Sequence, residues 1–167
     1  NSLLIRVTRN CPWNRCTFCP VYKRSRFSIR PLEHVKKDIE AVYSCVKMLR
    51  ESDTESGRTR PADIHESMKK LSAADMPAFN AAYHWYTDGM HSIFIQDANS
   101  LIINPRDLVD ILLLLKKRFP RVQRITSYAR SHTISRISDR DLSSIRNAGL
   151  NRIHIGLESG ADPVLEK

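Results

Sequence analysis

Four short apolar segments, separated by stretches long enough for helices, constrain the fold of this chain more than any other feature. Their pattern predicts strands at residues 3–7, 92–95, 122–128 and 152–156. Three of the strand centres, Ile93, Ile125 and Ile153, lie 32 and 28 residues apart, which is typical of repeated right-handed βα units. The chain is therefore predicted to be an α/β protein with a parallel sheet, either open or curled toward a barrel.

The helices expected between these strands each carry one apolar stripe. The first begins near Pro31, and its stripe repeats at alternating spacings of four and three residues through Val35, Ile39, Val42, Val46 and Leu49. Asn104 and Pro105 are typical of a helix start, as capping residue and first-turn proline. A further helix is expected from about Asp139 to a glycine stop at Gly149.

Residues 51–90 interrupt this order and are expected to form an insertion after the first helix. Residues 51–63 are polar and contain both a glycine and a proline, which is typical of a flexible surface linker. A pair of helices is expected to follow, with Ser72 and Asp75 as the two ends of a capping box. The insertion is therefore predicted to be a linker followed by helices.

Three cysteines follow the first expected strand directly, as Cys11, Cys16 and Cys19 in the spacing C-x4-C-x2-C. Three thiolates on one short loop favour an iron–sulfur cluster that leaves one iron free for another ligand. Structural zinc usually takes four ligands, and a disulfide framework is typical of small secreted chains. Plant-type ferredoxins combine this spacing with a distant fourth cysteine. Cys45 fits that spacing, but it falls at the edge of the first helix's apolar stripe and is interpreted as a packing residue.

The composition limits the class of protein. With 167 residues, 41% of them hydrophobic and 27% charged, the chain is long enough for one globular domain with a core. The net charge of +9 is compatible with nucleic-acid binding, but the basic residues are scattered, and positive charge also attracts acidic proteins or carboxylated substrates. No apolar run approaches the ~20 residues of a membrane span, so no membrane partner is expected. Unpaired, clustered cysteines indicate a reducing, cytoplasmic compartment.

Polar side chains follow the second, third and fourth expected strands. They are Asp97, Asn99, Ser127, Arg130, Glu158 and Ser159. The carboxyl ends of parallel strands lie at one edge of a sheet, where ligands bind in such folds. Carboxylates suit an ammonium group or ribose hydroxyls, Arg130 suits a carboxylate, and the amide and hydroxyl groups offer neutral hydrogen bonds. The alternative is that these residues only cap helices and solvate loops.

On these residues the chain resembles the radical S-adenosylmethionine (SAM) superfamily. The resemblance rests on the three cysteines with Phe18 before the last, on Phe94–Asn99, and on the stretch Gly156-Leu-Glu-Ser-Gly160. That last stretch is similar to one in the branch of tRNA methylthiotransferases, Elongator-type catalytic subunits and oxygen-independent coproporphyrinogen oxidases. The match covers the chain apart from residues 51–90. It departs from the usual pattern in one extra residue between the first two cysteines and in Gln96–Asn99, where a Gly-Gly-Glu-like segment is usual.

The resemblance implies an activity and its cofactors. Three cysteines would hold a [4Fe–4S] cluster whose free iron chelates SAM, and a low-potential electron donor of the flavodoxin or ferredoxin type would supply one electron. Reductive cleavage of the sulfonium–C5′ bond then yields methionine and a 5′-deoxyadenosyl radical that abstracts hydrogen from a small-molecule, protein or RNA substrate. Phe18 would pack beside the cluster and adenine, Asp97 would hold the amino group and Arg130 the carboxylate. Glu158 and Ser159 would bind the ribose or the amino-acid end, and Asn99 and Ser127 are further candidates for contacts with SAM.

The resemblance also implies a fold, a partial (βα) barrel of the radical SAM type with about four βα units in residues 1–167. A full core usually has six units, so residues 1–167 are expected to be the N-terminal part of a catalytic core that continues beyond Lys167. Two alternatives stay open. One is a ferredoxin-like iron–sulfur electron carrier, and the other is a zinc-dependent module that binds nucleic acid.

Overall fold

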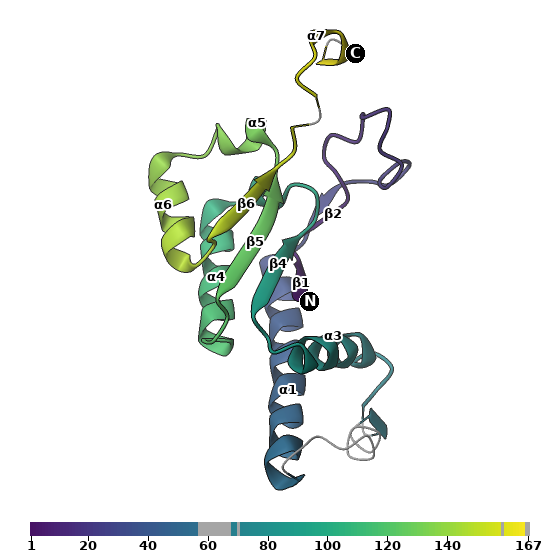
Figure 1. The fold of residues 1–167 in the computed structure, drawn as a ribbon, viewed down its shortest axis with the longest axis vertical. Coiled ribbons are helices and arrows are strands. Elements are labelled where there is room, and N and C mark those ends of the chain that lie inside the picture. Colours follow the sequence, from purple (N-terminus) through teal and green to yellow (C-terminus); the bar gives the residue numbers. More distant parts are fainter. Residues whose placement is uncertain (57–67, 70, 158, 166–167) are drawn as a thin grey trace.

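The chain folds around a parallel four-stranded sheet with helices packed on it, as the computed structural model of Figure 1 shows. The structure describes residues 1–56, 68–69, 71–157 and 159–165. The sheet contains, in spatial order, β1 (Ser2–Arg6), β4 (Ser92–Gln96), β5 (Arg124–Ala129) and β6 (Arg152–Ile155). All three neighbouring pairs are parallel, so the predicted α/β class and parallel sheet are confirmed, and each strand begins and ends within about two residues of its prediction. A separate two-stranded antiparallel sheet pairs β2 (Thr8–Arg9) with β3 (Ser28–Ile29).

The helices begin and end largely where their capping residues predict. Their bounds are α1 (Leu32–Ser56), α3 (Met76–Thr87), α4 (Pro105–Arg118), α5 (Ser131–Ile134), α6 (Asp139–Ala148) and α7 (Asp162–Leu165), with a 3-10 turn η1 (Ser100–Ile102). The Asn104 side chain caps α4 by accepting a hydrogen bond from the backbone N–H of Arg106 at 2.9 Å. Gly149 ends α6 with φ of +126°, a conformation that glycine adopts without strain. Within the described residues, no helix has both the length and the apolar character needed to cross a membrane.

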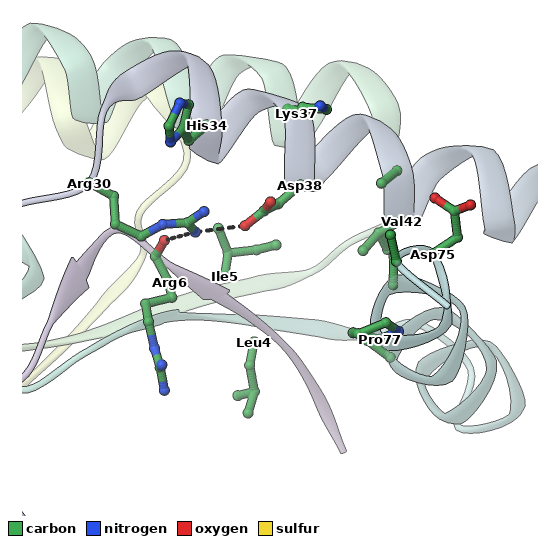
Figure 2. A pocket seen from close by; sticks show the side chains of 14 residues that line it. Leu4, Ile5, Arg6, Arg30, His34, Lys37, Asp38, Val42, Asp75 and Pro77 are labelled. Atoms are coloured by element: carbon green, nitrogen blue, oxygen red, sulfur yellow. Dashed lines mark hydrogen bonds and ion pairs between the residues drawn. The ribbon is translucent and has the colours of Figure 1, made fainter. Parts of the chain in front are cut away.

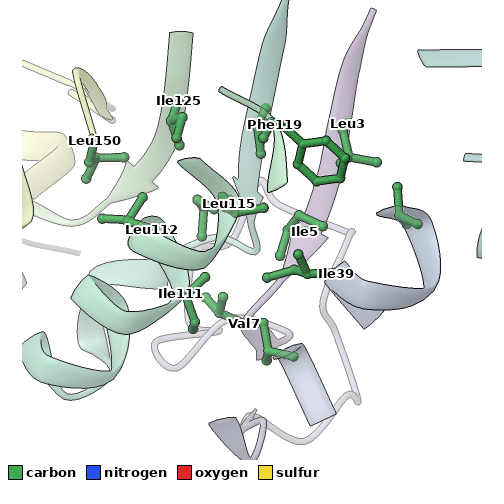
Figure 3. Close-up of a cluster of buried hydrophobic side chains, with 14 of the residues drawn as sticks. Leu3, Ile5, Val7, Ile39, Ile111, Leu112, Leu115, Phe119, Ile125 and Leu150 are labelled. Atoms are coloured by element: carbon green, nitrogen blue, oxygen red, sulfur yellow. The ribbon is translucent and has the colours of Figure 1, made fainter. Parts of the chain in front are cut away.

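One face of the sheet carries the hydrophobic core. Strand residues that alternate along each strand, such as Leu3, Ile5 and Ile125, point toward α1 and α4 and are at most 3% exposed (Figure 3). From α4 the stripe of Leu108, Ile111, Leu112 and Leu115 meets them, and the predicted stripe of α1 is buried throughout. Cys45 lies in the same layer at 5% exposure, which confirms its interpretation as a packing residue. Burial is the main reason that the pKa of its thiol is raised.

The insertion differs from its prediction at two boundaries. The linker was expected from Glu51, but α1 continues to Ser56, where an i,i+4 ion pair between Lys47 and Glu51 at 3.7 Å supports the helix. The capping box was expected at Ser72–Asp75. Ser72 Oγ does donate to Asp75 at 2.6 Å, but the helix begins only at Met76, directly before a proline that favours a helix start. The rest of the linker and most of the first expected helix of the pair lie outside the described residues.

Helix α3 of the insertion is part of the core rather than an appendage. Its residues Phe79, Ala82 and Trp85 are at most 1% exposed and pack with α1 and β1. The indole N–H of Trp85 donates to the backbone carbonyl of Ser92 at 2.9 Å, at the first residue of β4. The insertion therefore helps to fix the start of the strand that carries Asp97 at its other end.

The opposite face of the sheet exposes aromatic side chains. Tyr128 on β5 is 50% exposed and lies between Phe94 on β4 and His154 on β6. The ring centroids of Phe94 and Tyr128 are 4.9 Å apart, and those of Tyr128 and His154 are 5.7 Å apart. Side chains alternate between the faces of a strand, so β4 and β5, which build the core with one face, present a row of rings together with β6 on this open face.

Candidate functional site

The three clustered cysteines lie on a long loop at the carboxyl edge of the sheet. This cysteine loop, residues 10–27, connects β2 to β3, and it begins four residues after the end of β1. In Figure 1 it projects from the same end of the sheet as α5 and the segment that follows β6. The predicted placement of the cysteines at the strand-end edge agrees with this position.

Two asparagines link the outgoing and returning halves of the cysteine loop. Asn10 and Asn14 adopt left-handed backbone conformations, with φ of 65° and 47°, which asparagine tolerates better than most residues. The Asn10 side-chain amide donates to the carbonyl of Arg26 at 2.7 Å. The Asn14 amide donates to the carbonyls of Tyr22 at 2.7 Å and Ser25 at 3.3 Å. The loop therefore has a defined structure made by its own side chains.

Cys11, Cys16 and Cys19 are half-buried. The backbone N–H of Cys19 donates to the carbonyl of Cys16 at 3.4 Å, and the Cys11 sulfur accepts a 3.5 Å hydrogen bond from the backbone N–H of Asn14. Within the described part of the chain, no three His, Cys, Asp or Glu side chains converge closely enough to hold one metal ion. The donor set suits an iron–sulfur cluster because it offers three thiols on one partly exposed loop. Binding one would require the three side chains to turn toward one another.

Asp97, at the end of β4, lies directly against the cysteine loop. Its carboxylate accepts hydrogen bonds from the Tyr22 hydroxyl at 2.7 Å and from the backbone N–H of Asn10 at 3.0 Å, and the Arg6 guanidinium lies 3.9 Å away. The residue is only 7% exposed, so its charge depends on these partners. The pKa of Tyr22 is raised well above its usual range, chiefly by burial, then by the hydrogen bond to Asp97 and its charge, and also by Cys11 and Cys19. The Tyr22 hydroxyl therefore stays protonated and remains a donor.

The end of β5 also contacts the cysteine loop. The guanidinium of Arg130 lies 4.5 Å from the ring centre of Trp13, and that of Arg15 lies 5.2 Å from the same centre. Asn99, which is 1% exposed, supports this arrangement because its side chain accepts from the backbone N–H of Arg130 at 3.1 Å and donates to Thr133 at 2.8 Å. Asn99 and Arg130 are thus brought together: the Arg130 side chain contacts Trp13 of the loop, and the buried Asn99 side chain holds the Arg130 backbone.

The other predicted site residues have different surroundings. Ser127 is fully buried, and its hydroxyl donates to the backbone carbonyl of Ile95 at 3.1 Å, so we assign it a structural role. Ser159 accepts a local hydrogen bond from the backbone N–H of Ala161 at 3.1 Å, in a segment that runs away from the sheet in Figure 1. Phe18 is 66% exposed at the surface of the loop. Glu158 lies outside the described residues.

A separate hollow lies along the free edge of β1, between α1 and the start of α3 (Figure 2). Its volume is about 630 Å³. Arg30, just after β3, lines it and donates both to the carbonyl of Arg6 at 2.8 Å and to Asp38 at 2.6 Å. These contacts anchor the returning end of the cysteine loop to β1 and α1, and they pair Arg30 with an acid of the same hollow.

The sequence predictions missed the residues that hold the loop in place. Asn10, Asn14, Trp13 and Tyr22 all lie in or next to the cysteine motif, and none was singled out. Two asparagines within five residues are a signal for left-handed turns. Asp97, which binds Tyr22, and Arg130, which lies over Trp13, directly follow β4 and β5, far along the chain, so no local pattern could have indicated these two contacts.

We compared the chain with protein-family models, curated proteins and solved structures. No family model matches it. No curated protein matches it either, and the search of solved structures gave no match. These comparisons therefore assign no family to the chain.

Proposed function

We propose that this chain is part of the catalytic core of a radical SAM enzyme. It binds a [4Fe–4S] cluster through Cys11, Cys16 and Cys19 and cleaves SAM reductively to act on a substrate of unidentified class. The observation that supports this most directly is the position of a structured three-cysteine loop at the carboxyl edge of a parallel sheet. Ligands in open and barrel-like parallel sheets bind at that edge. In this proposal the sheet is one part of a partial (βα) barrel.

The loop suits cluster binding because its own fold does not depend on the cysteine side chains. The base of the loop is held by Asn10, Asn14, Asp97 and Arg30. The only hydrogen bond to a cysteine sulfur within the described residues is the long one from Asn14 to Cys11. The thiols can therefore reorient toward a common centre without breaking the contacts that shape the loop. When bound with SAM, the cluster would deliver one electron from an external donor to the sulfonium–C5′ bond.

The side chains around the loop offer groups that suit the two ends of SAM. Arg130 carries a positive charge at the end of β5, where it can meet the methionyl carboxylate in a charge-assisted hydrogen bond. The open face of the sheet presents Phe94, Tyr128 and His154, whose rings can stack with adenine. Glu158 and Ser159, in the stretch after β6, remain proposed contacts for the ribose or amino-acid end.

The function can be tested in the full-length protein, reconstituted anaerobically with iron and sulfide. With SAM and dithionite, the wild-type protein should release methionine and 5′-deoxyadenosine, measured by liquid chromatography and mass spectrometry. The Cys16→Ala variant should lose both the cluster absorbance and SAM cleavage, because two thiolates are too few for such a cluster. The matched control is Cys45→Ala, which should keep both, since this residue is buried in the core.

Three results would contradict the proposal. One is a cluster-loaded wild-type protein that produces no 5′-deoxyadenosine. The second is zinc without iron in the purified protein, which would favour a zinc-dependent module. The third is loss of the cluster in Cys45→Ala, which would favour a four-cysteine electron carrier.

A further inference from the structure

Asp97 faces the cysteine loop rather than the open face of the sheet. Both of its carboxylate oxygens are used: Oδ1 accepts from the Tyr22 hydroxyl, and Oδ2 accepts from the Asn10 backbone N–H and lies nearest to Arg6. A carboxylate that is 7% exposed and has three such partners is held firmly, because breaking any one leaves a buried charge less well paired.

The contacts of Asp97 reach both ends of the cysteine motif. Asn10 directly precedes Cys11, and Tyr22 follows Cys19 by three residues. One side chain directly after β4 therefore fixes the chain on either side of the three thiols. Tyr22 connects further into the loop, because its carbonyl accepts from the Asn14 side chain at 2.7 Å. No other described side chain outside residues 1–30 has hydrogen bonds to both halves of the loop.

We propose that Asp97 and Tyr22 form a positioning pair that holds the cysteine loop over the end of β4, so that its three thiols are set for cluster binding. This inference rests on the proposed function. It differs from the role that the sequence resemblance implies for Asp97, which was to bind the amino group of SAM. Asp97 acts here through the loop, and Tyr22 acts as the donor that connects the loop to it.

The proposal predicts graded effects for two near-isosteric variants. Asp97→Asn removes the charge and one acceptor oxygen, so the side chain can accept from Asn10 or Tyr22 but cannot keep both contacts at full strength. Tyr22→Phe removes a single hydrogen bond. The control variants are Asp110→Asn, an acid on α4 whose side chain is 56% exposed, and Tyr43→Phe, on α1 beside Phe119.

The first readout needs no cluster. Trypsin cleavage of the full-length apo-protein at the exposed Lys23, Arg24 and Arg26, mapped by mass spectrometry, reports how often the loop opens. We expect cleavage to rise roughly ten- to a hundredfold in Asp97→Asn and about fivefold in Tyr22→Phe. The controls should match the wild type. Because the two residues share one contact, the cleavage rate of the double variant should rise by less than the product of the two single increases. Circular dichroism should show that all variants are folded.

The second readout is iron retention after anaerobic reconstitution, measured against a chelator. Groups that orient metal ligands are worth about 10- to 100-fold in metal affinity, so Asp97→Asn should release iron at least about tenfold more readily than the wild type. If trypsin cleavage and iron retention are unchanged in both variants while the wild type holds a cluster, the positioning role is wrong and the proposed function stands. If the wild type holds no iron, the proposed function fails, and so does the link from loop to cluster. A cleavage rate that rises without any change in iron retention would also overturn the positioning role.

Discussion

The helix-covered face of the sheet and the cysteine loop are stabilised in different ways, although the loop lies at the carboxyl edge of that sheet. The covered face is a continuous layer of buried apolar side chains from β1, β4, β5, α1 and α4. The cysteine loop, in contrast, has three half-buried cysteines and an exposed Phe18, and its shape comes from a small number of polar contacts. Packing supplies the stability of the first region, whereas hydrogen bonds and two cation–aromatic contacts on Trp13 define the second.

The chain thereby combines a rigid scaffold with a loop that can adapt its shape. Apolar packing is spread over many contacts, so the sheet stays in place when the loop rearranges. The loop depends on a few anchors, mainly Asp97, Arg130 and Arg30, and its cysteine side chains are nearly free of partners. Segments that must reorganise around a ligand are generally drawn from such regions of low local stability.

The largest expected effect is that of a core substitution, which should destabilise the helix-covered face without changing the cysteine loop. Leu112→Ala should lower the free energy of unfolding by about 2–5 kcal/mol, because Leu112 is fully buried between α4 and the sheet. Chemical denaturation followed by circular dichroism measures this, and trypsin cleavage within the cysteine loop under native conditions should stay at the wild-type rate. The neighbouring Leu113→Ala, at a site 52% exposed, is the control and should change stability by less than about 0.5 kcal/mol. Loop cleavage that rises with the loss of core stability would show that the regions are not independent.

An intermediate effect compares the four thiols. In the folded apo-protein, Cys11, Cys16 and Cys19 should react with iodoacetamide more than about tenfold faster than Cys45, which must wait for local opening. Burial raises the pKa of the Cys45 thiol, so less of it is thiolate at a given pH and its reaction should accelerate only at higher pH than that of an ordinary thiol. Peptide mapping after timed alkylation at several pH values measures this. In denaturant all four should react alike, and equal rates in the native protein would contradict the contrast between loop and core.

The smallest expected effect concerns the anchor at the end of β5. Arg130→Ala removes the cation that lies over Trp13 but keeps the backbone N–H that Asn99 binds. A contact of this kind is worth about 0.5–1 kcal/mol, so trypsin cleavage at Lys23 and Arg24 should rise about two- to fivefold. Arg136→Ala, at an exposed position nearby, serves as the matched control. An unchanged cleavage rate would mean that Arg130 is not an anchor. In that case Asp97 and Arg30 would be the main anchors of the loop.

Much of the fold could be predicted because its signals are local. The strands and the stripe of α1 repeat at the periods of their secondary structure, and Asn104 and Gly149 mark helix ends by their own backbone chemistry. Where a local signal had two interpretations, prediction was less accurate. Polar residues 51–56 suited a linker as well as the exposed side of a helix, and the structure makes them the end of α1. The burial of Trp85 was not predicted, because it depends on where α3 meets β4.

Periodicity and spacing are properties of neighbouring residues, and they were enough to predict a parallel α/β sheet with three cysteines near the end of its first strand. The roles of the strand-end side chains, in contrast, became visible only in the folded chain. Asp97 and Arg130 contact the cysteine loop, Ser127 is buried against the backbone of β4, and Tyr22 becomes a partner of Asp97 from 75 residues away. These roles depend on hydrogen bonds, whose distances and directions are set only when the strands pair and the loop folds back over them.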